Sequence, residues 1–336
     1  MPSITGVSAV DELPGPEGHG PLQGDRASTG QLGDRLFSGT ARGAGLLVIA
    51  LVSMIAVFLL SQALPALAKD KVSFLTSTQW DVDGTPLQFG IANMLWVTVL
   101  SSAIAMLIAV PFGVGVALFI TQYAPAWLSR PAATLVDLLA AVPSIVYGLW
   151  GLQVFGPHMA GVQADLERLF GWFPLFKDAG VGAASTILTV AVVLSIMVLP
   201  IVTALSREVF AQTPSSHTDA ALALGATRWE MIRTAVLPFG KQGVISASML
   251  GLGRALGETV AVMIILSALA DGTSWSWSVF SGGENLAYKI VNKAAEFDSP
   301  QKAGAFMAAG LVLFLLTFVV NVIARIVIER QKAFTE

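Results

Sequence analysis

Residues 91–119 read IANMLWVTVLSSAIAMLIAVPFGVGVALF and contain no charged side chain. About 20 helical residues are enough to cross a hydrocarbon core about 30 Å thick, so this run is long enough to span a membrane. Backbone polar groups in lipid must be satisfied internally, and only helices and closed barrels satisfy them. The run therefore predicts a transmembrane helix.

Five further apolar segments of similar length predict the same structure elsewhere in the chain. The 336 residues are 54% hydrophobic and only 12% charged, which is too apolar for a soluble domain of this length. We therefore expect an all-α membrane protein with six transmembrane helices, kinked at Pro111 and Pro143. The six expected spans are 44–67, 91–119, 132–155, 181–206, 243–269 and 303–328.

The first forty residues differ from the rest, because they are rich in Gly, Pro and Ser and have no sustained apolar period. Such a segment cannot bury enough surface to offset the entropy lost on ordering. We expect a disordered tail over residues 1–43 and a transmembrane domain over residues 44–330. An even number of spans puts both termini on one side, and a slight excess of Lys and Arg there favours the cytoplasm.

Several kinds of chemistry are excluded by composition and motifs. Cysteine is absent and the three histidines lie far apart in the sequence, so we expect no thiolate and no metal site. A net charge of −3 provides no general basic field for nucleic acid. The phosphate-binding pattern G-x-x-x-x-G-K-[ST] is missing, so we expect that this chain does not itself bind and hydrolyse ATP in the P-loop manner. We expect no catalytic residue and no bound cofactor in this chain.

The longest expected inner loop, residues 207–242, contains two helix-start patterns. It reads REVFAQTPSSHTDAALALGATRWEMIRTAVLPFGKQ. Ser216 is followed three residues later by Asp219, and Thr227 is followed by Glu230 at the same spacing. Each pair matches a capping box, in which two side chains satisfy the free amides of a first helical turn.

A glycine and a proline complete this loop as a helix, turn, helix unit. Gly225 lies between the two helix starts, where a helix end needs a residue that tolerates a left-handed backbone. Pro238 is expected to close the second helix. The small side chains of Ala220 and Ala221 would let another surface approach the first helix closely, so the unit is suited to docking a partner.

Four stretches resemble a known transporter family. DAALALGATRWEMIRTAVLP, residues 219–238, resembles the EAA coupling loop of ABC-importer permeases. The other three resemble the PstC-type phosphate permeases of that superfamily. They are AVPSIVYGLWGL (141–152), LGLGRALGETVAVMIIL (250–266) and LVLFLLTFVVNVIAR (311–325). The resemblance covers about residues 44–330, and it departs from the family at Asp219, where Glu is usual, and at Val260, where Met is expected.

The resemblance implies a type I ABC importer permease (MetI-like) fold with a cytoplasmic coupling helix in the bacterial inner membrane. It implies a heterodimer with a PstA-type permease subunit, a PstB-type ATPase dimer that uses ATP, and a PstS-type phosphate-binding protein, with membrane lipid around the spans and no nucleic acid. The residues assigned to ATPase coupling are Ser216, Asp219, Ala220, Ala221, Gly225, Thr227, Glu230 and Pro238.

Arg254 and Glu258 lie inside the fifth expected span, where a charge costs about 2.5–3.5 kcal/mol on insertion scales. At i and i+4 of one helix, the pair has two interpretations. It is a salt bridge that locks the bundle, or Arg254 offers its planar donors to a passing oxyanion while Glu258 partly neutralises it. Ser144 and Thr259 are further candidates for the substrate path, although such hydroxyls often bond their own helix.

Other functions stay open at this point. Arginine recognises sulfate or phosphonate by the same charge and geometry as phosphate. An ion-coupled secondary transporter would use Glu258 as a proton site. A role in sensing phosphate supply is compatible with transport.

Overall fold

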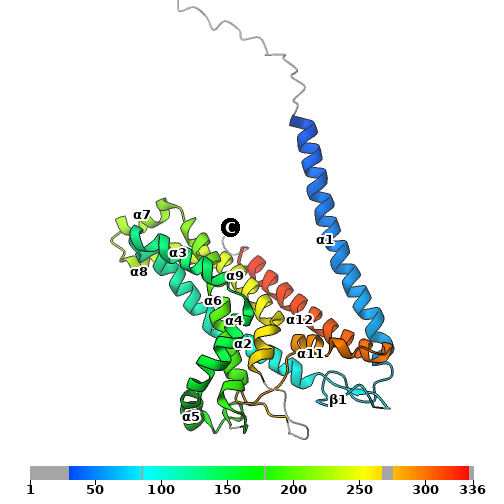
Figure 1. The fold of residues 1–336 in the computed structure, drawn as a ribbon. Helices are drawn as coiled ribbons and strands as arrows, with labels where there is room; N and C mark the ends of the chain where they lie inside the picture. Colours follow the sequence, from blue (N-terminus) through cyan, green and yellow to red (C-terminus); the bar gives the residue numbers. More distant parts are fainter. Residues whose placement is uncertain (1–29, 85, 178, 267–274, 333–336) are drawn as a thin grey trace, which may run out of the picture. The chain divides into compact units, whose positions relative to one another are not determined.

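The computed structural model describes residues 30–84, 86–177, 179–266 and 275–332. The chain divides into two compact units, residues 1–54 and 55–336. Within the described residues, the first unit consists of the helix that starts at Gly30. The second unit carries the helical bundle (Figure 1).

Helices make up nearly all of the regular structure in the described ranges. The α-helices are α1 (Gly30–Leu67), α2 (Ala92–Leu118), α3 (Ala126–Ala140), α4 (Ser144–Trp150), α5 (Met159–Phe170), α6 (Ile187–Ala211), α7 (Ser215–Ala223), α8 (Arg228–Met231), α9 (Leu237–Gly257), α10 (Val260–Ile265), α11 (Leu286–Asn292) and α12 (Pro300–Lys332). Three π-helical turns are η1 (Phe119–Tyr123), η2 (Gly151–Phe155) and η6 (Ile232–Val236). Short 3₁₀ turns are η3 (Gly156–His158), η4 (Pro174–Phe176), η5 (Ala183–Ser185) and η7 (Ala294–Glu296).

The prediction of a helical membrane protein is confirmed, but the count of six spans is not reproduced. Among the described residues, four helices are long and apolar enough to cross a membrane, namely α1, α2, α6 and α12. A fifth is reached if α3 and the helical segment after it count as one broken span. The remaining expected span, 243–269, is interrupted near its middle.

The two expected proline kinks have different outcomes. The segment 132–155 bends by 90° between Ala140 and Ser144. Pro143 starts α4 from an extended backbone, because a proline at that position has no amide for the preceding helix. Pro111, in contrast, lies inside α2, which continues past it.

The fifth span differs from prediction at both ends. Its helix does not begin near Gly243, because α8 continues through η6 into α9. Pro238 occupies the first turn of α9 and closes nothing, so the expected helix end there is wrong. Pro238 lies just after the π-helical turn η6, and such turns are places where a helix accommodates a local loss of its regular hydrogen bonds. At the other end, α9 stops at Gly257 and α10 begins at Val260.

Residues 30–43, which the sequence assigns to the disordered tail, form the first part of α1. They contain no proline, and a helix that is nucleated in the apolar run after residue 43 can propagate backward at little cost. Residues 1–29 lie outside the described part of the chain, so the structure does not bear on the rest of the expected tail.

The core of the bundle lies where α2, α6 and α9 pack against one another. One buried cluster joins Val97 of α2, Leu194 and Met197 of α6, and Ile265 of α10. At Gly151 the chain passes so close to this cluster that an added Cβ would lie 2.7 Å from Val193 Cγ2. The apolar faces of the spans are therefore used for helix packing inside one chain as well as for contact with lipid.

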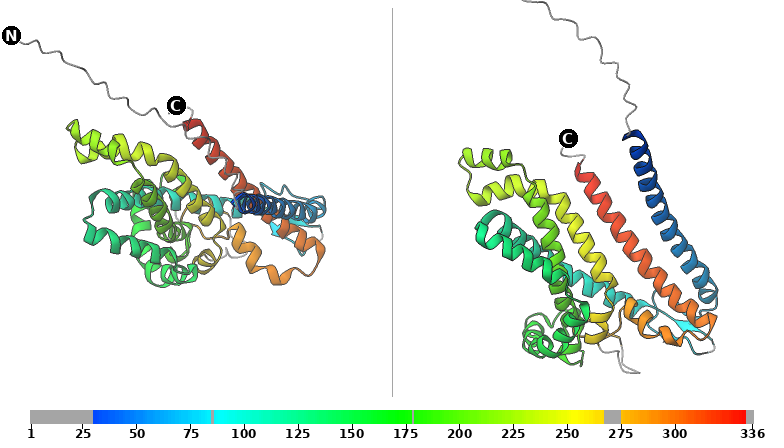
Figure 2. Two further views of the ribbon diagram at one scale, coloured as in Figure 1. Left: turned by 90° about the horizontal axis from the view of Figure 1, so that it is seen from above. Right: turned by 45° about the horizontal axis from the view of Figure 1, so that its top comes forward.

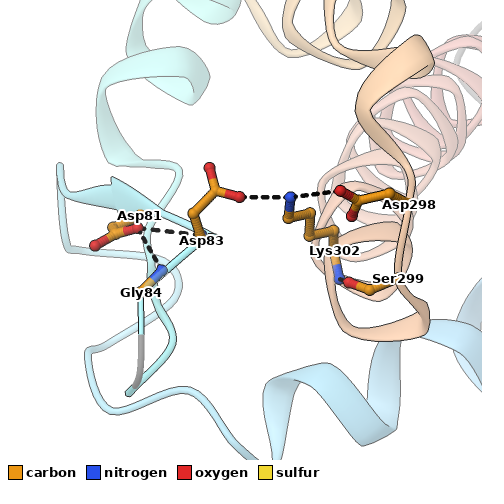
Figure 3. A network of polar contacts seen from close by, with 6 residues as sticks. All are labelled: Asp81, Asp83, Gly84, Asp298, Ser299 and Lys302. Carbon is orange, nitrogen blue, oxygen red and sulfur yellow. Dashed lines mark hydrogen bonds and ion pairs between the residues drawn. The ribbon is translucent and has the colours of Figure 1, made fainter.

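A two-stranded hairpin that the sequence analysis did not predict follows α1. Strand β1 (Trp80–Asp81) pairs antiparallel with β2 (Gln88–Phe89), with Trp80 opposite Phe89. Asp81 Oδ1 accepts hydrogen bonds from the amides of Asp83 and Gly84, which closes the turn. Figure 3 shows how Lys302 of α12 reaches both Asp83 (2.5 Å) and Asp298 (3.0 Å), so the hairpin is tied to the start of α12.

The two ends of the bundle carry different structures, as Figure 1 and the right-hand view of Figure 2 show. The hairpin and α5 lie at one end, and α7 and α8 lie at the other, with the last residues of α12. The break between α9 and α10 falls between these ends. The loop expected to dock a partner is thus separated from the hairpin end by the length of the bundle.

Candidate functional site

Arg254 lines a cleft of about 630 Å³ between α9 and α12. The α9 side of the cleft is formed by Ser246, Met249, Leu250, Gly253 and Arg254, and the α12 side by Asn321, Ala324, Arg325 and Ile328, with Ile201 of α6 at one edge. On each helix these residues recur at spacings of three and four, which places them on a single face. The cleft is therefore a groove between two regular helices.

The guanidinium of Arg254 has unused hydrogen-bonding capacity. The residue is half-buried, and within the described residues its side chain takes part in no hydrogen bond or ion pair. Arginine carries five donors that remain charged at any physiological pH. A half-buried, unpaired guanidinium in a groove is a favourable site for an anion that accepts hydrogen bonds.

Glu258 does not pair with Arg254, so the salt-bridge interpretation is wrong, and Glu258 does not neutralise Arg254 as the second interpretation expected; the role of Arg254 itself stays a prediction. Glu258 follows the last residue of α9 in an extended conformation, with φ −69° and ψ 127°. Its Oε1 accepts a hydrogen bond from the amide of Ala261 at 3.1 Å, so the carboxylate caps the first turn of α10. The spacing i, i+4 brings side chains together only within a continuous helix, and here the helix has ended.

The other two candidates for the path also lie outside the cleft. Thr259 donates from Oγ1 to the carbonyl of Gly257 at 3.3 Å, which is the local bond considered from the sequence. Ser144 begins α4, and α4 packs against α10. Neither residue is among those that line the cleft with Arg254.

Three polar residues of the cleft were missed by the sequence analysis. Ser246 lies two turns before Arg254 on α9, and Asn321 and Arg325 lie one turn apart on α12. Arg325 Nε is 3.2 Å from Glu329 Oε1, in an exposed ion pair along the same helix. The sequence signal for this face of α12 is an asparagine in an otherwise apolar span, followed by an arginine at i+4.

The loop after α6 has the helix, turn, helix form that was expected, with one correction. Thr227 caps α8, since its Oγ1 accepts from the Glu230 amide while Glu230 Oε2 accepts from the Thr227 amide at 2.7 Å. The predicted box at Ser216 and Asp219 is wrong, because α7 starts after Pro214 and Ser216 already lies within its first turn. The extended backbone at Pro214 begins the helix earlier than a serine cap would.

Gly225 has the backbone that the sequence predicted. Its φ is +85°, in the left-handed region. The amide of Gly225 donates to the Leu222 carbonyl at 2.9 Å, and the amide of Ala226 donates to the Ala221 carbonyl at 3.1 Å. These bonds satisfy the last carbonyls of α7 and turn the chain into α8.

The surface of this loop exposes large apolar side chains. Leu224 is 90% exposed and Trp229 is 57% exposed. Ala220 is exposed, whereas Ala221 packs against the buried cluster around Phe210. A groove of about 450 Å³ lies beside the loop, lined by His217, Ala221, Thr234, Ala235, Pro238 and Phe239. Exposed apolar groups in the loop and a groove beside it are typical of a protein interaction site.

Electrostatics at the loop come from the capping box. The Thr227 amide and then its hydroxyl donate to the Glu230 carboxylate, and these bonds lower the pKa of Glu230 below its usual value. Within the described residues, no group of three or more His, Cys, Asp or Glu side chains could hold a metal ion.

Residues 109–333 match the family of binding-protein-dependent transport system inner membrane components. The chain belongs to this family. It is 52% identical over 297 residues to phosphate transport system permease protein PstC 2 of Mycobacterium tuberculosis, covering 87% of this chain and 91% of the relative. PstC of Mycobacterium leprae is 51% identical over 295 residues (87% and 92%), and PstC of Haemophilus influenzae is 36% identical over 306 residues (89% and 94%).

Solved structures agree with the family in fold. A bacterial ABC transporter involved in the import of the acidic polysaccharide alginate matches with a TM-score of 0.54 at 16% identity, over 88% of this chain and 99% of that chain. Members of the binding-protein-dependent family are transport components of the inner membrane, so this chain is a membrane permease subunit of an ABC importer and not an enzyme.

Proposed function

We propose that this binding-protein-dependent permease imports phosphate, and that Arg254 contacts the anion on its passage. The observation that carries the proposal is the unpaired, half-buried guanidinium of Arg254 in the cleft between α9 and α12. The choice of phosphate as substrate rests on the relatives, which are named phosphate transport system permease proteins. Asn321 and Arg325 add further donors along the same groove.

The partners follow from the family and from the coupling loop. A PstB-type ATPase dimer would dock on the exposed Leu224 and Trp229 and use ATP, since this chain has no phosphate-binding loop of its own. A PstA-type permease subunit would cover the open side of the cleft, and a PstS-type protein would deliver phosphate. We expect both termini, like the loop 207–242, to face the cytoplasm.

Charge and geometry at Arg254 can be tested separately. Arg254→Gln keeps a polar side chain but removes the charge, and we expect phosphate uptake by the reconstituted complex to fall about tenfold to a hundredfold. Arg254→Lys should recover only part of the activity, because an ammonium lacks the bidentate donors of a guanidinium. Arg168→Gln is the matched control, since Arg168 is exposed on α5 away from the cleft, and it should transport normally.

The double variant with glutamine at both Arg254 and Glu258 distinguishes a role of Arg254 in the substrate path from a role of the two residues as a stabilising salt bridge. No ion pair joins the two side chains, so the double variant should be as inactive as Arg254→Gln alone. Restored uptake in the double variant would contradict the role of Arg254. Competition by sulfate or phosphonate tests the choice of anion. Uptake by the chain alone in liposomes, driven by an ion gradient, would indicate a secondary transporter instead.

A further inference from the structure

The break between α9 and α10 is held by a side chain that lies far away in the sequence. Asn285 is 1% exposed and precedes α11. Its Nδ2 donates to the backbone carbonyl of Glu258 at 2.9 Å, while its Oδ1 accepts from the amide of Tyr288 at 2.7 Å. One side chain therefore caps α11 and satisfies a carbonyl that the end of α9 leaves free.

The residue type matters for this double contact. A helix cap alone is provided equally well by Ser or Asp. The Glu258 carbonyl, however, also needs a donor. An ionised Asp has none, and the hydroxyl of Ser ends about one bond nearer its own backbone than the Asn amide nitrogen, so it does not reach both partners. The amide of Asn presents an acceptor and a donor on one planar group. The hydrogen bond to the Glu258 carbonyl therefore requires asparagine, whereas the helix cap does not.

The segment that carries Asn285 is held in place by hydrogen bonds to α2 and α6. The amide of Leu286 donates to Thr98 Oγ1 of α2 at 3.1 Å, and Thr98 is itself buried. Ser281 lies a few residues before Asn285, and its carbonyl accepts a hydrogen bond from the amide of Ile187, at the start of α6, at 2.9 Å. The segment that carries Asn285 is fixed to α2 and α6, so its contact with Glu258 fixes the end of α9 relative to both helices.

We propose that Asn285 is a positioning residue for the anion path, an inference that rests on the proposed function of Arg254. By holding the Glu258 carbonyl, Asn285 fixes the last turn of α9, from which Arg254 projects into the cleft. It also joins that turn to the segment before α11, so a change in this segment alters how Arg254 faces the anion. Asn285 itself does not line the cleft.

Two substitutions keep the cap and remove the donor. Asn285→Ser and Asn285→Asp both retain an oxygen that can accept from Tyr288. The carboxylate of Asp has no donor, and the hydroxyl of Ser is too short to reach the Glu258 carbonyl from the cap position. In proteoliposomes containing the whole complex, we expect phosphate uptake per assembled complex to fall about tenfold, which is the effect of losing one buried hydrogen bond. ATP hydrolysis stimulated by the loaded binding protein should stay near the wild-type rate.

The comparison of uptake with ATP hydrolysis separates positioning from a general structural role. If both rates fall together, or if both variants transport like the wild type, the proposal is overturned. Asn285→Ser decides the matter if a buried aspartate prevents folding. Arg254→Gln is assayed in parallel. If it transports normally, the proposed function of Arg254 fails, whereas an inactive Arg254→Gln beside fully active Asn285 variants overturns only the role of Asn285.

Discussion

Gly225→Val isolates the contribution of a single backbone angle to coupling. The left-handed φ of +85° at Gly225 lets the chain turn from α7 into α8. No heavy atom outside the immediate neighbours lies within 4 Å of a Cβ built on this glycine, so a side chain there meets no steric obstacle. The cost of the substitution therefore comes from the backbone alone.

The size of that cost can be worked out from the conformation. A non-glycine residue in the left-handed region costs about 1–2 kcal/mol, and a branched side chain lies at the upper end. This free energy lowers the population of the native turn relative to displaced forms by a factor of about 5–30. Gly225→Asn is the matched control, because asparagine tolerates the same region at much lower cost.

The assay measures phosphate imported per ATP hydrolysed in proteoliposomes containing the assembled complex. Gly225→Val should lower this ratio by a factor of about 5–30, while Gly225→Asn should remain within about twofold of the wild type. Normal uptake by the valine variant would refute a coupling role for the turn. An equal loss in both variants would show that the backbone angle is not the cause.

The remaining predictions concern topology, packing and pH. A cysteine placed at Ser216, in a chain that has none, should be protected from an impermeant thiol reagent added outside sealed cells; labelling from outside would invert the proposed orientation. Gly151→Ala should destabilise by about 1–3 kcal/mol, because its Cβ would lie 2.7 Å from Val193 Cγ2, whereas Gly161→Ala meets no atom within 4 Å and should not lower the thermal midpoint in detergent. The capping box of α8 should stabilise its helix fully above the usual carboxyl pKa and lose this effect as pH falls through the lowered pKa of Glu230. Hydrogen exchange of the α8 amides, corrected for the intrinsic rate, should show this loss in the wild type and not in Glu230→Gln.

Features governed by neighbouring residues could be predicted from the sequence. The Thr227 and Glu230 capping box and the left-handed Gly225 follow from side chains within a few positions, and both appear in the structure. Ser216 failed as a cap because Pro214, two residues earlier, starts the helix first. Two local signals for a helix start compete here, and the spacing of Ser216 and Asp219 alone did not show that the helix would start after Pro214.

Features that depend on distant residues could not be predicted. Residues 257–259 contain no proline, and apolar residues lie on both sides of them, so a continuous span was the natural expectation. The break is stabilised by Asn285, which lies 27 positions away. The cleft likewise needs α9 and α12 side by side, so Asn321 and Arg325 become partners of Arg254 only in the folded chain.

The continuity of α8, η6 and α9 has a mechanical consequence. Arg228 to Gly257 form one uninterrupted helical rod, and at about 1.5 Å per residue Arg254 lies about 40 Å from the capping box. The segment includes the π-helical turn η6 and Pro238, which are positions where helices commonly bend. The end of α9 is held by the hydrogen bond from Asn285 to the Glu258 carbonyl, so α9 would pivot about this contact. A lateral displacement of Trp229 would then tilt α9 about this contact, and the Arg254 guanidinium would shift within the cleft between α9 and α12.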